Sequence, residues 1–315
     1  MKQFRYVFFI LFILTQIFTA CSKDDDEDLV PKKPEKEVTN KDNSNNSSNQ
    51  EEEGTLTTYR IEGNNIVKLE DHKISDELVS FQKDVNKHQE MWALVKKIVP
   101  ENYRTFFNKF LIIHSEEIAG YVSQTENDLS KWKMGLAINM AYTNGILNAD
   151  KEFSYTIIHE FGHVLTLNNT QVEAPGDANN TSTFFTGEGS SKTNSYINQF
   201  FQKFWKEIYE EHQGYNQDDV YKFYEKYKDR FVTDYAATNP GEDIAESFAY
   251  FVTKDNKPEP TNIANKKVLF MYNYPELVEL RNKIRSSSTK ALPAPGSWKS
   301  KSIYKIQKKE VLVRR

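Results

Sequence analysis

The feature that most constrains this chain is the segment His159-Glu160-Phe161-Gly162-His163. It lies within residues 151–168, where apolar side chains recur at the spacing of a buried helix face. Residues four apart lie on one face of a helix, so both imidazoles can reach one metal ion. Glu160 then lies next to that ion, where a carboxylate can accept a proton from water. The alternative is a helix face with two solvent-exposed histidines.

Two histidines leave a zinc ion short of a third protein ligand, and residues 234–249 are the best source of one. A Pro-Gly pair precedes a predicted helix on which Glu242 and Glu246 are four residues apart, on one face. We predict Glu242 as a metal ligand and Glu246 as the partner of a ring N–H, that of His159. The alternative for Glu242 is a solvated carboxylate that complements the helix dipole, which gives no reason for Glu246.

Charge and cysteine content exclude several functions. The 315 residues include 41 Lys and Arg and 45 Asp and Glu, and the residues after Gly54 hold 34 of each sign. A domain without a basic excess has no electrostatic footprint for nucleic acid, so no nucleic-acid partner is expected. The single cysteine excludes an intramolecular disulfide, a zinc-cysteine cluster and a CxxC redox pair.

The N-terminus has the pattern of an export signal. Residues 1–5 are basic, residues 6–18 are almost continuously apolar, and Thr19-Ala20-Cys21 follows. This apolar stretch is shorter than a membrane span of about 20 residues, so we predict a cleaved signal peptide over 1–20. The small residues before Cys21 resemble the lipobox of bacterial lipoproteins, which implies that Cys21 is lipidated and anchors the mature protein. The alternative is an ordinary signal peptide that leaves a free thiol.

Residues 21–54 contain an acidic run followed by a stretch rich in Pro, Lys, Asn and Ser. Such a segment buries too little apolar surface to offset its chain entropy, so we predict a disordered acidic tether. The acidic run resembles the signal that sends some Gram-negative lipoproteins to the outer face of the outer membrane, which implies a cell-surface location. A solvated linker on a periplasm-facing protein is the alternative. At the other end, residues 291–315 are predicted to form a basic tail.

Residues 55–290 are expected to form one α+β domain, because strand signals precede a long run of helices. Strands are predicted at 106–114 and 133–142, and helices at 75–99, 151–168, 196–211, 218–231, 242–252, 263–272 and 276–285. Residues 135–142 are either an edge strand along which an extended peptide pairs or an interior strand. Residues 170–194 form a long loop, either a lid over a substrate or a disordered segment. The four other histidines are interpreted as surface or packing residues: His72, His88, His114 and His212.

Tyr235 precedes Glu242 by seven residues, and with the HEFGH segment and Glu246 it completes a recognisable arrangement. This arrangement resembles the catalytic half of gluzincin metallopeptidases of the anthrax lethal factor type. The resemblance implies a zincin-like metallopeptidase domain with a small sheet, an active-site helix and a helical C-terminal half. It implies zinc held by three residues, namely His159, His163 and Glu242.

The same resemblance implies catalytic roles for two further residues. Glu160 would be the general base, and the phenol of Tyr235 would donate to the oxyanion, a contact usually worth about 2.7–4 kcal/mol. The alternative for Tyr235 is packing beneath the helix.

Together with the lipoprotein start, the arrangement resembles a bacterial family of zinc metallohydrolase lipoproteins associated with TonB-dependent nutrient importers. This implies a zinc peptidase outside the cell that cleaves a peptide or protein substrate, is anchored to the outer membrane and has such an importer as a partner. A binding lipoprotein without turnover is the competing hypothesis, and hydrolysis of a non-peptide amide is a third. The intact Glu160 favours an enzyme, because a pure binder needs no general base.

Overall fold

The computed structural model describes residues 54–149, 152–216 and 219–287. The predicted signal peptide, the tether up to residue 53, the basic tail and Cys21 lie outside these ranges. Within them, no helix combines the length and the apolar character that crossing a membrane requires.

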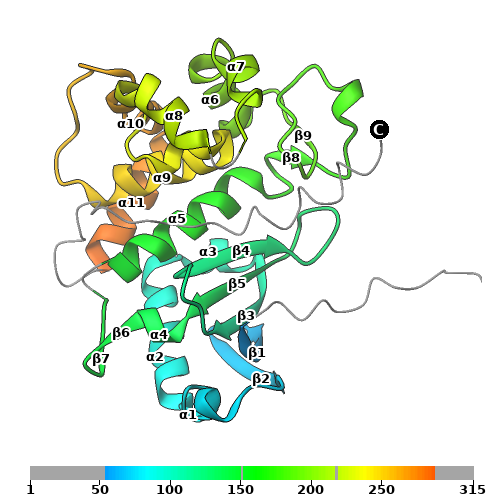
Figure 1. Ribbon diagram of the computed structural model, residues 1–315, viewed down its shortest axis with the longest axis vertical. Helices are drawn as coiled ribbons and strands as arrows, with labels where there is room; N and C mark the ends of the chain where they lie inside the picture. The colour runs from blue at the N-terminus through cyan, green and yellow to red at the C-terminus, as the bar shows by residue number, and fades with distance from the viewer. Residues whose placement is uncertain (1–53, 150–151, 217–218, 288–315) are drawn as a thin grey trace, which may run out of the picture. The chain divides into compact units, whose positions relative to one another are not determined.

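A five-stranded sheet forms the first part of the domain (Figure 1). Its strands run in the order β2-β1-β3-β5-β4, with β3 parallel to β5 and the other neighbours antiparallel. A mixed α/β architecture with a small open sheet is thus confirmed. The strand bounds are β1 (Thr55–Glu62), β2 (Asn65–Asp71), β3 (Phe107–Ile113), β4 (Gly120–Gln124) and β5 (Trp132–Ala137).

The predicted strand over 133–142 is too long. Strand β5 ends at Ala137, and the chain then forms the helical turn α4 (Ile138–Ala141) and a hairpin of β6 (Tyr142–Thr143) and β7 (Ile146–Leu147). The hairpin turns at Asn144 and Gly145, which both have positive φ, as a two-residue turn of this kind requires. Because β5 lies between β3 and β4, it is an interior strand, and β4 is the edge strand on that side.

The predicted helix over 75–99 is two helices, preceded by the short η1 (Asp76–Leu78). The chain breaks at Asp84, whose φ of −81° and ψ of 69° are not helical and whose carboxylate accepts from Lys87 N–H at 3.1 Å. Helix α2 packs on the sheet, with the ring centroids of Trp92 and Phe110 5.4 Å apart. The bounds here are α1 (Val79–Lys83), α2 (Val85–Ile98) and α3 (Glu101–Arg104).

Helices dominate the remainder of the domain. The ends of α5, α9, α10 and α11 lie within two residues of the predicted ends. The prediction of one helix over 196–211 is wrong at residues 205–208. Helix α6 ends at Phe204 and α7 begins at Tyr209, and the turn between them places Trp205 in the core. The predicted helix over 218–231 ends early, at Lys226. The bounds are α5 (Glu152–Leu167), α6 (Tyr196–Phe204), α7 (Tyr209–Gln213), α8 (Val220–Lys226), α9 (Pro240–Thr253), α10 (Ile263–Met271) and α11 (Pro275–Ser287).

Residues 170–194 contain more structure than a simple loop. They include β8 (Val172–Glu173) paired with β9 (Ser190–Ser191), and the short η2 (Ala178–Asn180). Phe184 is buried, and its ring stacks on Phe201 of α6 with a centroid distance of 4.2 Å. The segment is therefore anchored to the core.

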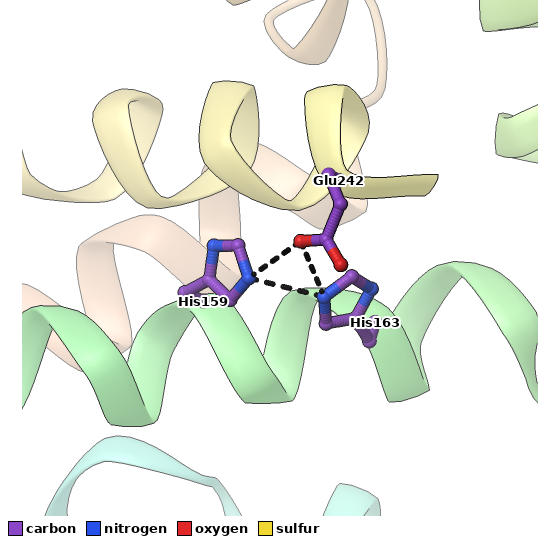
Figure 2. Close-up of side chains that lie close together, drawn as sticks. All are labelled: His159, His163 and Glu242. Atoms are coloured by element: carbon purple, nitrogen blue, oxygen red, sulfur yellow. Dashed lines mark hydrogen bonds and ion pairs between the residues drawn. The ribbon is translucent and has the colours of Figure 1, made fainter. Parts of the chain in front are cut away.

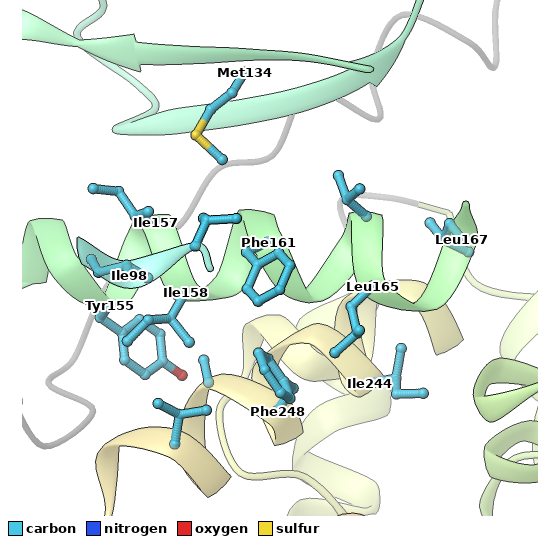
Figure 3. Close-up of a cluster of buried hydrophobic side chains, with 14 of the residues drawn as sticks. Ile98, Met134, Tyr155, Ile157, Ile158, Phe161, Leu165, Leu167, Ile244 and Phe248 are labelled. Atoms are coloured by element: carbon cyan, nitrogen blue, oxygen red, sulfur yellow. The ribbon is translucent and has the colours of Figure 1, made fainter. Parts of the chain in front are cut away.

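The core is centred on α5, which lies between the sheet and α9 (Figure 3). Ile157 and Phe161 of α5 belong to the same buried cluster as Met134 of β5 and Phe248 of α9. A helix that is apolar on nearly every face is stable only when it is enclosed on all sides. The polar side chains of α5 from His159 to His163 are consequently held inside the protein.

Candidate metal centre

His159, His163 and Glu242 converge on one point between α5 and α9 (Figure 2). The two Nε2 atoms are 3.0 Å apart, and Glu242 Oε2 lies 3.1 Å from His159 Nε2 and 3.2 Å from His163 Nε2. The exposed fractions of the three residues are 4%, 5% and 0%. Solvent-exposed histidines and a solvated helix-terminal carboxylate are therefore both excluded.

Local backbone geometry places these three side chains. The histidines are one helical turn apart on α5, and Glu242 lies in the first turn of α9. Helix α9 begins after Asn239, whose side chain accepts from Glu242 N–H at 2.9 Å, with Pro240 as the first helical residue. This cap fixes the start of the helix and hence the face on which Glu242 lies.

Gly162, between the two histidines, permits the close crossing of α5 and α9. A Cβ at this position would lie 3.2 Å from the Cα of Ala245 and 3.2 Å from Cδ1 of Phe248. These separations are tighter than most contacts of a real Cβ, so a larger residue requires the facing atoms of α9 to move by a few tenths of an ångström. The glycine of the HEFGH segment thus contributes to the short distance between the histidines and Glu242.

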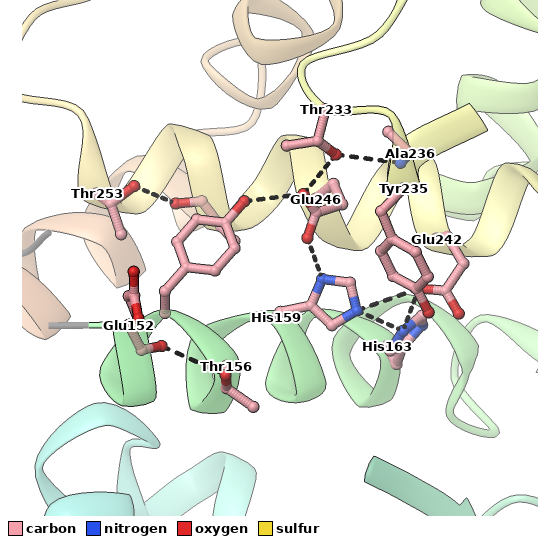
Figure 4. A network of polar contacts seen from close by, with 12 residues as sticks. Glu152, Thr156, His159, His163, Thr233, Tyr235, Ala236, Glu242, Glu246 and Thr253 are labelled. Carbon is pink, nitrogen blue, oxygen red and sulfur yellow. Dashed lines mark hydrogen bonds and ion pairs between the residues drawn. The ribbon is translucent and has the colours of Figure 1, made fainter. Parts of the chain in front are cut away.

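Glu246 lies one turn after Glu242 and contacts the other ring nitrogen of His159 (Figure 4). Its Oε1 is 2.7 Å from His159 Nδ1, and its Oε2 accepts from Tyr155 OH at 3.1 Å and from Thr233 Oγ1 at 2.7 Å. In the neutral imidazole, a carboxylate at this distance assigns the proton to Nδ1, which leaves the lone pair of Nε2 directed at the three-residue group.

The three converging atoms fit a divalent metal. Tetrahedral zinc with bonds of about 2.0–2.1 Å places its ligand atoms about 3.3–3.4 Å apart. The atoms here are separated by 3.0–3.2 Å. Buried acceptor atoms that face one another repel unless a proton or a cation lies between them. Two imidazoles and a carboxylate suit zinc and also other first-row divalent ions.

The charges of the site are strongly coupled. Burial alone would lower the pKa of His159, but its contacts with Glu242 and Glu246 outweigh burial and raise that pKa well above its usual range. Burial opposes ionisation of Glu242, yet the two histidines hold its pKa below the ordinary value. Burial raises the pKa of Glu160, and the histidines offset this only in part. Glu160 is therefore a stronger proton acceptor than a solvated carboxylate.

A small cleft opens beside this group. Its walls are formed by the start of β4, by residues 155–160 of α5 and by the segment that carries Thr233 and Tyr235. His159 and Glu160 are among the lining residues. Gly120 lets the edge strand approach α5, because a Cβ there would lie 3.0 Å from Thr156 Cγ2. Tyr235 is the first residue of η5 (Tyr235–Thr238), and its ring centroid is 5.7 Å from that of His159.

The structure thus brings together every residue that the sequence singled out in the folded region. It also adds Tyr155 and Thr233, which sequence reasoning missed. Tyr155 lies one turn before His159, and this helical spacing could have indicated it. Thr233 lies outside any periodic pattern and has no such signal. Of the other histidines, His88 and His212 are buried away from the centre, where they bond to Tyr59 and to the Ala237 carbonyl.

Comparisons with known protein families, with curated proteins and with solved structures find no match to this chain.

Proposed function

We propose that this protein is a zinc-dependent metallopeptidase with a zincin-like domain. The observation that carries the proposal is the buried group of His159, His163 and Glu242, which lies beside a cleft that Glu160 faces. A metal-binding group of purely structural role needs no neighbouring carboxylate directed at a cleft. The placement of Glu160 therefore favours hydrolysis over metal storage.

Zinc held by the three ligands would supply a water with a pKa near 7 and would polarise the scissile carbonyl. Glu160 accepts the proton of the attacking water and passes it to the leaving amine. Tyr235 donates its phenol hydrogen to the carbonyl oxygen as negative charge develops there. Glu246 keeps the His159 ring in the orientation and tautomer that a metal ligand needs. The edge strand β4 offers backbone groups for pairing with an extended peptide.

The location follows from the N-terminal pattern and is part of the same proposal. Lipidation at Cys21 would anchor the enzyme to the outer membrane, with its domain displayed outside the cell. A TonB-dependent importer is the proposed neighbour, so the substrate would be an extracellular peptide or protein. Protease treatment of intact cells tests this, since a protein shielded from external protease cannot be on the surface.

The central test combines metal analysis with cleavage of a proteome-derived peptide library, with and without a chelator. We expect about one zinc per chain and cleavage that the chelator abolishes. Glu160→Gln should retain zinc and lose hydrolysis. Glu152→Gln is the matched control, because Glu152 is an exposed carboxylate on the same helix.

The outcomes separate the competing functions. Hydrolysis that survives in Glu160→Gln refutes the assignment of the base. Bound zinc without cleavage of any peptide favours a binding lipoprotein, or an enzyme for an amide that is not a peptide.

A further inference from the structure

The hydroxyl of Thr233 connects two parts of the site. It donates to Glu246 Oε2 at 2.7 Å, and it accepts from Ala236 N–H at 3.1 Å (Figure 4). Ala236 directly follows Tyr235 in η5. One hydroxyl therefore joins the turn that carries Tyr235 to the carboxylate that holds His159.

The chain of contacts is short and mostly buried. It runs from His159 Nδ1 through the carboxylate of Glu246 to Thr233 and then to the backbone of the turn. His159 and Glu246 are 4% and 3% exposed, so water competes little for the bond between them, whereas Thr233 is half-buried at the edge of the cleft. Tyr155 also donates to Glu246, at 3.1 Å, so the carboxylate has a second hydroxyl partner on α5.

We propose that Thr233 is a positioning residue that couples the turn bearing Tyr235 to metal binding at His159. The inference rests on the proposed function and adds to it a physical connection between a metal ligand and the oxyanion donor. With a metal ion bound at its Nε2, His159 would keep one ring orientation, Glu246 would be held against its Nδ1, and the Thr233 hydroxyl would be held against Ala236 N–H. The turn would then be ordered before any substrate arrives.

Three variants of the full-length protein separate this role from simple packing. Thr233→Val keeps the shape and removes both hydrogen bonds, whereas Thr233→Ser keeps the hydroxyl. Thr156→Val is the matched control, since Thr156 lines the same cleft and its hydroxyl donates to the Glu152 carbonyl of its own helix at 3.3 Å. If the valine variant does not melt cooperatively, Thr233→Ala removes the hydroxyl without a new contact.

The first measurement is hydrogen–deuterium exchange of the peptide that covers residues 233–238, with and without zinc. In the wild type, Thr233→Ser and Thr156→Val, zinc should slow this exchange. In Thr233→Val the exchange should be faster and insensitive to zinc. Zinc-dependent slowing that persists in Thr233→Val, or that is missing from the wild type, overturns the proposal.

The second measurement is zinc affinity, by competition with a colorimetric chelator. Loss of a hydrogen bond to a carboxylate that supports a ligand typically weakens metal binding by about 10–100-fold. We expect about a tenfold loss for Thr233→Val and recovery in Thr233→Ser. An affinity in Thr233→Val equal to that of Thr156→Val argues against the connection.

Neither measurement depends on turnover, so failure of the coupling through Thr233 can be distinguished from failure of the proposed peptidase function. Zinc binding that orders the turn, without hydrolysis of any peptide, contradicts the proposed function alone. Hydrolysis without this ordering contradicts the coupling alone. In an active enzyme at saturating zinc, Thr233→Val should lower kcat by misplacing the Tyr235 hydroxyl. In a Tyr235→Phe background that hydroxyl is already absent, so Thr233→Val should cause no further loss of kcat.

Discussion

Lys267→Met tests how the protein holds a buried charge next to the candidate metal centre. Lys267 of α10 and Asp243 of α9 are both fully buried and form an ion pair. Asp243 also accepts from Trp205 Nε1 at 2.7 Å, and the Lys267 ammonium lies 4.1 Å from the ring centroid of Phe231. Burial raises the pKa of Asp243 to about 6 and lowers that of Lys267 to about 8. The two charges persist only because each has the other.

The size of the effect follows from what remains after substitution. Methionine fills nearly the same volume, so packing is retained and Asp243 is left with one N–H donor. Removing one partner of a buried pair costs about 3–5 kcal/mol. Asp243 can escape this loss by taking up a proton, which sets an upper limit to it. Protonating a carboxyl of ordinary pKa 3.8 at pH 7 costs about 1.4 kcal/mol for each pH unit of difference, or about 4 kcal/mol in total. We expect Lys267→Met to lower the free energy of unfolding by about 3–4 kcal/mol.

Urea denaturation of the metal-free protein at pH 7, followed by circular dichroism, measures this loss. Lys266→Met is the matched control, since Lys266 is exposed on the same helix, and it should change stability by less than about 0.5 kcal/mol. The double variant Lys267→Met with Asp243→Asn keeps an acceptor for Trp205 and removes both charges. It should recover to within about 1 kcal/mol of the wild type. A double variant as unstable as Lys267→Met would show that packing, not charge, causes the loss.

Three further predictions concern Gly162 of α5, Arg281 of α11 and His88 of α2. Gly162→Ala requires the Ala245 backbone and the Phe248 ring to move by a few tenths of an ångström, which shifts Glu242 of the same helix relative to the histidines. It should therefore weaken zinc binding on the order of tenfold despite a helix propensity gain of about 1 kcal/mol, and unchanged affinity in chelator competition would contradict this. Arg281→Met removes the guanidinium that donates to Phe251 O at 2.7 Å and to Lys254 O at 2.6 Å, at the C-terminal end of α9. Arg285 still donates to the carbonyls of Val252, Thr253 and Lys254, so urea denaturation should show a loss of about 1–3 kcal/mol, which exposed Lys283→Met should not show. Burial lowers the pKa of His88, so the folded state binds fewer protons than the unfolded state and stability falls as the pH drops below about 6.5. Between pH 7.5 and 5.5, His88→Gln should therefore lose less stability than the wild type, and equal losses would count against the buried neutral imidazole.

The helical part of the fold could be predicted because its signals are local. Helix α9 has a Pro at its first position and carboxylates in its first turn, and α5 has apolar residues at helical spacing. Strand β1 was missed because polar residues occupy buried positions there, with Thr55 and Thr57 almost fully enclosed. Strand β4 was missed because it is short and only partly buried. Hydrophobic alternation, the signal of a half-buried strand, is confined to Tyr59–Glu62 in β1 and is absent from β4.

The candidate site divides in the same way. A spacing of four within a helix indicated His159 with His163 and Glu242 with Glu246, since such positions share a face. Glu160 was indicated by its position directly after the first histidine. Lys267 and Thr233 lie on other segments, and no sequence period relates them to α5 or α9. Their contacts exist only after α10 and the turn before η5 have packed against α9. Charged and polar residues brought together by tertiary structure alone cannot be found from a single sequence.

Helix α9 carries these contacts on two faces, and this explains how its rotation is specified. Glu242 and Glu246 face α5, whereas Asp243, about 100° further around the axis, faces Lys267 and Trp205. A rotation of α9 by one residue would direct Asp243 towards the histidines and leave the Lys267 ammonium buried without a counter-ion. Apolar packing alone would specify the rotation less strictly. Helix α9 is enclosed on nearly every face, with Ile244, Ala245 and Phe248 all fully buried, so a rotated helix would still bury apolar side chains. We infer that the Asp243–Lys267 pair is retained because it selects the one rotation that presents Glu242 to the metal ligands, even where an apolar pair would be equally stable.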